Sequence, residues 1–225
     1  LLSDGASIMR DGEYAFIGEK AVSGLQKLVD LKQLHRVTPN EFGAMSGAKA
    51  WRSFAVDKTV ATYPTKISNA NIIKLLSMSG KGFNYSVAMY PIGDAGLPIS
   101  AGKTVEAYGV LKQKDKGKEE MCVKFIQYIC SDKEQLNLVN QGVFPVKKSV
   151  GYIYANDRVI APFEKRLFMD EELGNLKDWQ MIDDILQGQI RMAIMGKKTA
   201  QEAVNDSYKQ VMELKQLDRS GKLRR

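Results

Sequence analysis

The most constraining feature of the sequence is a run, residues 51–64, in which a helical pattern passes directly into a strand pattern. Trp51 and Phe54 are three residues apart on one face of the predicted helix, where we expect them to be core residues. After a two-residue corner comes a predicted strand, Thr59–Tyr63, and Pro64 ends it because proline has no N–H to donate to a ladder. A helix that leads at once into a strand is typical of α/β domains, whose ligands bind where strands end.

Composition limits the classes of protein to consider. The chain has 225 residues, of which 44% are hydrophobic and 26% charged, which suits one large globular domain or two smaller ones. No stretch approaches the ~18 consecutive apolar residues of a membrane span. The net charge is +7, but the densest basic stretches, 112–118 and 215–225, read as a solvated loop and a frayed tail. Neither is interleaved with aromatic residues, so no nucleic-acid partner is expected.

The two cysteines, Cys122 and Cys130, lie on one predicted helix. A rise of about 1.5 Å per residue separates them by ~12 Å, whereas a disulfide needs Cα atoms within about 7 Å. We therefore expect both thiols to be reduced and unpaired, with Cys122 buried on the apolar stripe of the helix. Neither a disulfide scaffold nor a metal site is expected.

Local signals predict a hairpin, several helices and further strands. Asp11-Gly12 is a strong signal for a two-residue hairpin turn. The capping-box pattern, in which a Ser or Thr and a Glu three residues later cap each other, marks helix starts at Thr38, Ser131 and Thr199. Helices are predicted over 19–34, from Thr38 to the corner, over 69–78, up to Cys130, from Ser131 to Gly142, over 179–195 and from Thr199 onward. Strands are predicted at Tyr85–Tyr90 and Lys103–Val110.

No catalytic pattern stands out. The one histidine, His35, is expected to be a solvated residue at the end of a helix. Asp183 and Asp184 are consecutive, so on a helix they point about 100° apart and do not form a carboxylate pair. The run Gly80-Lys81-Gly82 lacks the upstream glycine and the following Ser or Thr of a phosphate-binding loop. We expect no enzyme activity and no cofactor.

The order of the pieces is more informative than any single one. The predicted strand that ends in Tyr90-Pro91-Ile92-Gly93 is followed by Tyr108-Gly109-Val110 and a lysine-rich loop. Gly142-Val143-Phe144-Pro145-Val146 comes after a pair of helices, and a long helix then leads to Gly196-Lys197-Lys198-Thr199. This succession, from about residue 14 to 217, resembles the carboxy-terminal portion of the family 1 extracellular solute-binding proteins of bacterial ABC importers, which are relatives of maltose-binding proteins.

The resemblance implies an α/β fold, a two-lobed periplasmic-binding-protein-like clamp that closes on a small solute. It places residues 1–82 in the second lobe, 83–150 in the first lobe and 151–217 in the second lobe again, with 218–225 as a flexible basic tail. The strand Tyr85–Tyr90 is expected to cross between the lobes. Members of the family are longer, so the fold is expected to be incomplete, without the amino-terminal part that carries the export signal and often a lipid anchor.

The function that the resemblance implies is binding without catalysis. A carbohydrate or sugar derivative would be held between the lobes and delivered to the membrane permease subunits of an ABC transporter. The implied protein is a bacterial monomer, extracellular and either lipid-anchored at the cell surface (a lipoprotein) or periplasmic. Pro64, Thr65 and Lys66 stand where the family commonly has a Gly and a Trp after the first strand, and a lysine there can pair with the phosphate or carboxylate of an anionic or derivatised sugar. By position, the implied ligand contacts are Tyr63, Thr65, Lys66, Glu106, Tyr108 and Trp179.

Two other classes of protein fit the same sequence. One is an α/β enzyme that acts on a small polar substrate through catalytic residues whose spacing in the sequence forms no recognisable pattern. The other is an intracellular ligand-sensing domain, which the free cysteines favour, although no helix-turn-helix segment accompanies it. Turnover of a substrate would identify the first, and saturable binding without turnover would favour the clamp.

Overall fold

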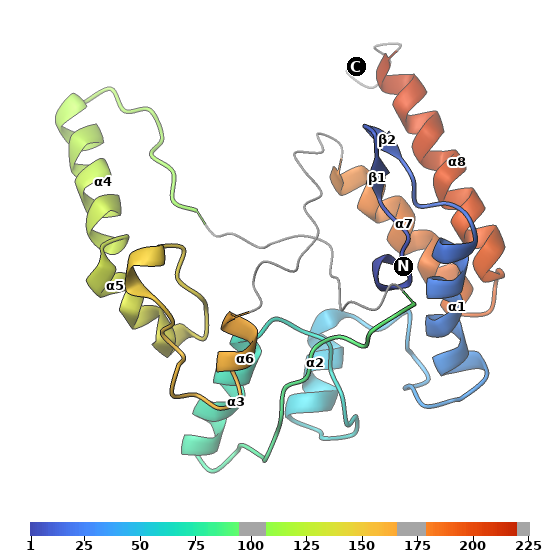
Figure 1. The fold of residues 1–225 in the computed structure, drawn as a ribbon, viewed down its shortest axis with the longest axis horizontal. Helices are drawn as coiled ribbons and strands as arrows, with labels where there is room; N and C mark the ends of the chain where they lie inside the picture. Colours follow the sequence, from blue (N-terminus) through green and yellow to red (C-terminus); the bar gives the residue numbers. More distant parts are fainter. Residues whose placement is uncertain (95–106, 166–178, 220–225) are drawn as a thin grey trace. The chain divides into compact units, whose positions relative to one another are not determined.

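Residues 1–94, 107–165 and 179–219 are described in the computed structural model, and they divide into two units (Figure 1). Unit 1 consists of Leu1–Tyr63, Tyr90–Gly102 and Asp170–Arg225, and unit 2 consists of Pro64–Met89 and Lys103–Met169. The chain therefore passes from one unit to the other several times. Which lobe each segment belongs to stays a prediction.

Three helices that are far apart in the sequence form the core of unit 1. They are α1 (Glu19–Gln33), α7 (Trp179–Ile194) and α8 (Ala200–Arg219), and each packs on the other two (Figure 1). Their contact is lined largely by small residues, which allow close helix approach, with Leu25, Val29 and Val204 as the larger buried side chains. Each such buried aliphatic side chain contributes about 1.5–3 kcal/mol of transfer free energy.

The predicted hairpin is confirmed and lies against this helical core. Strands β1 (Met9–Arg10) and β2 (Glu13–Tyr14) are antiparallel, and both turn residues have positive φ, 51° at Asp11 and 77° at Gly12. Lys215 of α8 pairs with Glu13 and lies 5.6 Å from the ring centroid of Tyr14. The prediction of a frayed tail is therefore wrong for residues 215–219, because α8 continues to Arg219 and Lys215 links it to the hairpin. The rest of the predicted tail, 220–225, lies outside the described residues.

Capping explains which predicted helix starts are right. At Thr199 both bonds of the capping box are present, because the N–H of Thr199 donates to Glu202 at 2.8 Å and the N–H of Glu202 donates to the Thr199 hydroxyl at 3.1 Å. The start at Thr38 is wrong. Residues 39–45 form successive turns, Gly43 has a φ of 91°, and helix α2 (Gly47–Ala55) begins only after the N-cap Ser46.

Unit 2 is built from short helices. They are α3 (Ser68–Met78), α4 (Lys116–Ile129), α5 (Asp132–Leu136) and α6 (Ala161–Glu164), with 3₁₀ turns η2 (Asn137–Gln141) and η3 (Lys148–Val150), while η1 (Leu2–Asp4) belongs to unit 1. The capping box at Ser131 is confirmed, since its hydroxyl accepts from the N–H of Glu134. The buried carboxylate of Glu164 accepts from the N–H groups of Ile153 and Tyr154, and this ties the loop before α6 to the helix.

The predicted strands Thr59–Tyr63 and Tyr85–Tyr90 are wrong, because neither segment pairs with another strand in the described residues. Of the predicted strand Lys103–Val110, residues 103–106 lie outside the described residues and 107–110 are not a strand. A strand is stable only when its N–H and C=O groups meet a partner, so a strand-like sequence alone does not make a ladder.

The cysteine prediction is right about pairing and wrong about burial. Both thiols are free, and α4 ends at Ile129 with Cys130 as its C-cap, close to the expected end. Cys122, however, is exposed, because α4 buries none of its residues in the described structure. None of the described helices is long and apolar enough to cross a membrane.

Candidate functional site

Three aromatic rings of unit 1 contact one another and form the candidate site. The rings of Phe54 and Tyr63 are stacked at 23° with centroids 5.9 Å apart, and Trp51 lies 5.7 Å from Tyr63 and 6.3 Å from Phe54. We call these three residues the aromatic cluster. All three side chains are half-buried, and none belongs to the two buried cores of unit 1. The expectation that Trp51 and Phe54 are core residues is therefore wrong.

The corner after α2 brings Tyr63 back to the helix. Lys58 has a φ of 54°, and the N–H of Thr59 donates to the carbonyl of Ser53 at 2.8 Å, as in a helix-ending motif that reverses the chain. The predicted corner is thus present, although a loop follows it where a strand was expected. The spacing of Trp51 and Phe54 on one helical face, followed by a chain reversal, was the sequence signal for their contact with Tyr63.

Trp179 is the other predicted aromatic contact in unit 1. It stands at the first residue of α7, half-buried, and packs against the buried cluster that includes Phe16, Ile182 and Val211. One part of the indole therefore contributes to the core. Its role as a ligand contact stays a prediction.

The remaining predicted contacts do not belong to unit 1. Thr65 and Lys66 are exposed residues just before α3, where the Thr65 hydroxyl accepts from the Asn69 side chain at 2.5 Å and the Lys66 carbonyl accepts from the Asn69 N–H at 3.1 Å. Tyr108 is also exposed. Glu106 lies outside the described residues. The structure thus places Tyr63 in contact with Trp51 and Phe54, which were not predicted as ligand contacts. That all six predicted contacts line one groove stays a prediction.

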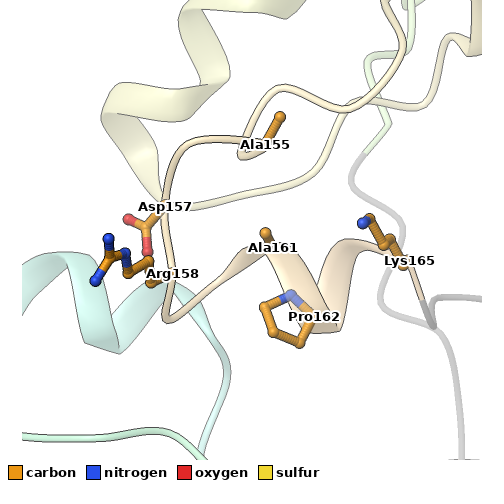
Figure 2. Close-up of a pocket in the computed structure, with 6 residues that line it drawn as sticks. All are labelled: Ala155, Asp157, Arg158, Ala161, Pro162 and Lys165. Atoms are coloured by element: carbon orange, nitrogen blue, oxygen red, sulfur yellow. The ribbon is translucent and has the colours of Figure 1, made fainter.

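Unit 2 has a surface hollow around the loop before α6 (Figure 2). It is lined by Ala155, Asp157, Arg158, Ala161, Pro162 and Lys165, and Figure 2 shows Arg158 and Lys165 on opposite sides of Ala161 and Pro162. One oxygen of Asp157 accepts from the N–H groups of Val159 and Ile160 and so serves to cap the turn. None of the residues that line the hollow is aromatic.

The chemistry available at the aromatic cluster is recognition of an apolar face with polar edges. Ring faces attract the C–H groups of a pyranose, while the Tyr63 hydroxyl and the Trp51 indole N–H can bond to hydroxyl groups. Within the described residues, no group of three or more His, Cys, Asp or Glu side chains is placed to hold a metal ion. The cluster thus offers a platform for binding a small polar molecule.

Comparison with known proteins shows similarity of fold. No family model and no curated protein matches the sequence. Two solved structures are similar. Maltose-bound MalE3 of T. maritima is 22% identical with a TM-score of 0.72, and the match covers 95% of this chain and 55% of that chain. The cyclic α-maltosyl-1,6-maltose binding protein from Arthrobacter globiformis is 13% identical with a TM-score of 0.61, and the match covers 92% and 52%.

These similarities confirm the predicted fold class. The chain has the two-lobed α/β fold of the two sugar-binding proteins and spans about half the length of each. The chain's own described residues supply mostly the helices of that fold and a single hairpin.

Proposed function

We propose that this chain binds a carbohydrate through the aromatic cluster of unit 1 and acts as the solute-binding component of an ABC importer. The observation that carries the proposal is the contact of three half-buried rings outside the core of unit 1. Half-buried rings are held in place by packing and still present an accessible surface. The two similar structures support the choice of ligand, since their titles name maltose and a cyclic maltosyl sugar.

The physics of such a site is a balance between stacking and hydrogen bonding. A ring that packs on the C–H face of a sugar gains about 0.5–1.5 kcal/mol beyond the burial of its area. A buried hydroxyl left without a partner costs about 1–3 kcal/mol, so polar groups around the ring select among sugars. Thr65, Lys66, Glu106, Tyr108 and Trp179 are the proposed polar and aromatic groups that complete the site in the closed clamp.

The proposed function also covers closure of the clamp, delivery of the sugar and the location of the protein. The bound sugar stabilises the closed arrangement of two lobes, and the closed form presents it to membrane permease subunits. The protein acts outside the cytoplasmic membrane, lipid-anchored or periplasmic, and performs no chemical reaction. It functions as a monomer.

Calorimetry with maltose and a panel of neutral and anionic oligosaccharides tests the proposal. We expect saturable binding without product formation. Tyr63→Ala and Trp51→Ala should each weaken the binding of the best ligand about fivefold or more, because truncation of a contacting aromatic ring typically costs at least 1 kcal/mol.

Tyr152→Ala is the matched control, because Tyr152 is an exposed tyrosine outside the cluster. It should leave the affinity unchanged. Unchanged affinity in both cluster variants, together with a lower melting temperature, would show that the rings only stabilise the fold. Formation of a product from any ligand in the panel would instead favour an enzyme.

A further inference from the structure

The surface hollow beside α6 in unit 2 has the size and the lining of a site for a small molecule. We call it the α6 hollow, and it is lined by Ala155, Asp157, Arg158, Ala161, Pro162 and Lys165. Its volume of about 470 Å³ lies within the roughly 300–1,000 Å³ that is usual for small-molecule sites. Three of the six residues are apolar, and the two cations lie on opposite sides of Ala161 and Pro162 (Figure 2). The α6 hollow thus joins an apolar surface to a positive charge on each side.

The loop that lines the α6 hollow is held in one conformation by hydrogen bonds to buried or half-buried carboxylates. The two oxygens of Glu164 accept from the N–H groups of Ile153 and Tyr154 at 2.9 and 3.0 Å. One oxygen of Asp157 accepts from the N–H groups of residues 159 and 160, also at 2.9 and 3.0 Å. A ligand site whose backbone is already fixed loses little conformational entropy when a ligand binds. The α6 hollow is therefore preorganised.

The two cations of the hollow are available to a ligand, whereas its carboxylate is already engaged. Arg158 and Lys165 are exposed, and neither forms an ion pair within the described residues. Asp157 caps the turn and also forms an ion pair with Lys74 at 3.8 Å. Arg158 is the only arginine in the described part of unit 2. A guanidinium group presents a planar fork of N–H donors that matches the two oxygens of a carboxylate or a phosphate.

We propose that the α6 hollow binds a small organic anion that carries an oxyanion group, carboxylate or phosphate, at each of its two ends. Arg158 binds one oxyanion group through its fork of donors, and Lys165 binds the other as a point charge. The body of the ligand packs against Ala161 and Pro162. The site shares no residue with the aromatic cluster, so this inference is independent of sugar binding.

Titration of the isotope-labelled chain, followed by two-dimensional NMR at constant ionic strength, tests the proposal. The probes are malonate, succinate and adipate, whose two carboxylates are joined by chains of increasing length, with phosphoglycolate as the phosphate-bearing dianion and propionate as the monoanion. We expect saturable shifts of the amide signals of Ala155 and Ala161. The best dianion should bind about fivefold or more tighter than propionate, because only a dianion reaches both cations.

A set of three variants assigns the charges. Arg158→Gln and Lys165→Gln should each abolish the advantage of the best dianion over propionate, because only one cation is then left in the hollow. Lys118→Gln is the matched control, since Lys118 is an exposed lysine on α4 of the same unit. It removes the same charge from the protein and should preserve the advantage of the dianion. Both hollow variants change exposed side chains, so their melting temperatures should match that of the original protein.

Three results would overturn the proposal. The first is the absence of saturable shifts at Ala155 and Ala161 with every probe. The second is a propionate affinity equal to that of all the dianions, since the hollow would then bind only one oxyanion group. The third is an equal effect of Lys118→Gln and Arg158→Gln, since binding would then follow the net charge of the protein and not the hollow. Tighter binding of phosphoglycolate than of any dicarboxylate would support the proposal and identify phosphate as one of the two groups.

Discussion

The buried carboxylate of Glu164 accepts a hydrogen bond from the backbone N–H of Tyr154 at 3.0 Å. Its other oxygen accepts from the N–H of Ile153 at 2.9 Å, so both oxygens are needed as acceptors. Glu164→Gln offers only one acceptor and turns an NH₂ group toward the second N–H. We expect a loss of about 1–3 kcal/mol in the free energy of unfolding, the cost of an unsatisfied buried group, measured by urea denaturation. Glu120→Gln on exposed α4 is the control and should be neutral.

Tyr154 itself predicts a pH dependence. Burial, together with the negative charges of Glu164 and Asp157, raises the pKa of Tyr154 to about 12 from the ordinary value of 10.0. The folded protein therefore keeps the phenol protonated where the unfolded chain ionises it. The stabilisation is fully present below pH 10 and is lost as the pH rises from 10 toward 12.

Absorbance at 295 nm should show one tyrosine that ionises later than the others, and this late step should vanish in Tyr154→Phe. The variant should also be less stable at pH 7 by about 1–2 kcal/mol, because the hydroxyl donates to the carbonyls of Val143 and Leu138. If the original protein and Tyr154→Phe lost equal stability above pH 10, the pH dependence would come from groups other than Tyr154.

Two glycines of unit 1 should respond in opposite directions to the same substitution. A methyl group at Gly93 would lie 2.2 Å from the carbonyl oxygen of Ser3, a contact that only a backbone shift can relieve. Gly93→Ala should therefore cost about 1–3 kcal/mol of stability. Gly188 lies inside α7 with open space around it, so Gly188→Ala should stabilise by roughly 0.5–1 kcal/mol. Thermal unfolding of both variants checks the pair, and an equal response would contradict the close approach at Gly93.

The end of α1 offers a stabilising change. Arg36 has a φ of 54°, and the N–H of Val37 donates to the carbonyl of Leu31 at 3.0 Å across it. Glycine is the residue that adopts this left-handed conformation without steric cost. Arg36→Gly should be more stable than Arg36→Ala by about 0.5–1 kcal/mol in thermal unfolding, since both remove the same side chain and only glycine relieves the backbone. Equal stability of the two variants would show that this cost is absent.

The sequence predicted helices well because their signals are local. The capping box at Thr199 and the reversal around Lys58 are complete within a few residues, so the neighbours of each residue decide its conformation. At Thr38 the local signal was overridden, because a left-handed Gly43 falls within what would be the second turn of the helix. Strands are different, since their stability depends on partners that the local sequence does not specify. Tyr85–Tyr90 has the sequence pattern of a strand, but it forms no backbone hydrogen-bond ladder with another described segment.

The candidate site was predictable only in part for the same reason. Tyr63 was chosen for its position at the end of a predicted strand, and the structure places it in an aromatic cluster although that strand is absent. Its partners Trp51 and Phe54 were expected in the core. Apolar spacing shows that two residues share a face of a helix, but it does not show whether that face meets the core or a loop. Trp179 is predicted as a ligand contact from the resemblance alone, and its packing against a buried cluster of unit 1 could not be read from the sequence because that cluster joins residues far apart in the chain.

The way in which α1 meets α7 also sets the order of events during synthesis. The side chain of Gln33 donates to the carbonyl of Ile194, a partner that lies 161 residues later in the chain. A ribosome adds about 5–20 residues per second, so α1 waits roughly 8–30 s before its partner helices exist. During that interval the apolar face of α1 is open to chaperones and to other nascent chains, while the whole of unit 2 emerges. Because its helices come from distant parts of the sequence, unit 1 has a high contact order and can fold only after α7 and α8 have been synthesised. We expect the packing of these helices on α1 to limit the folding rate.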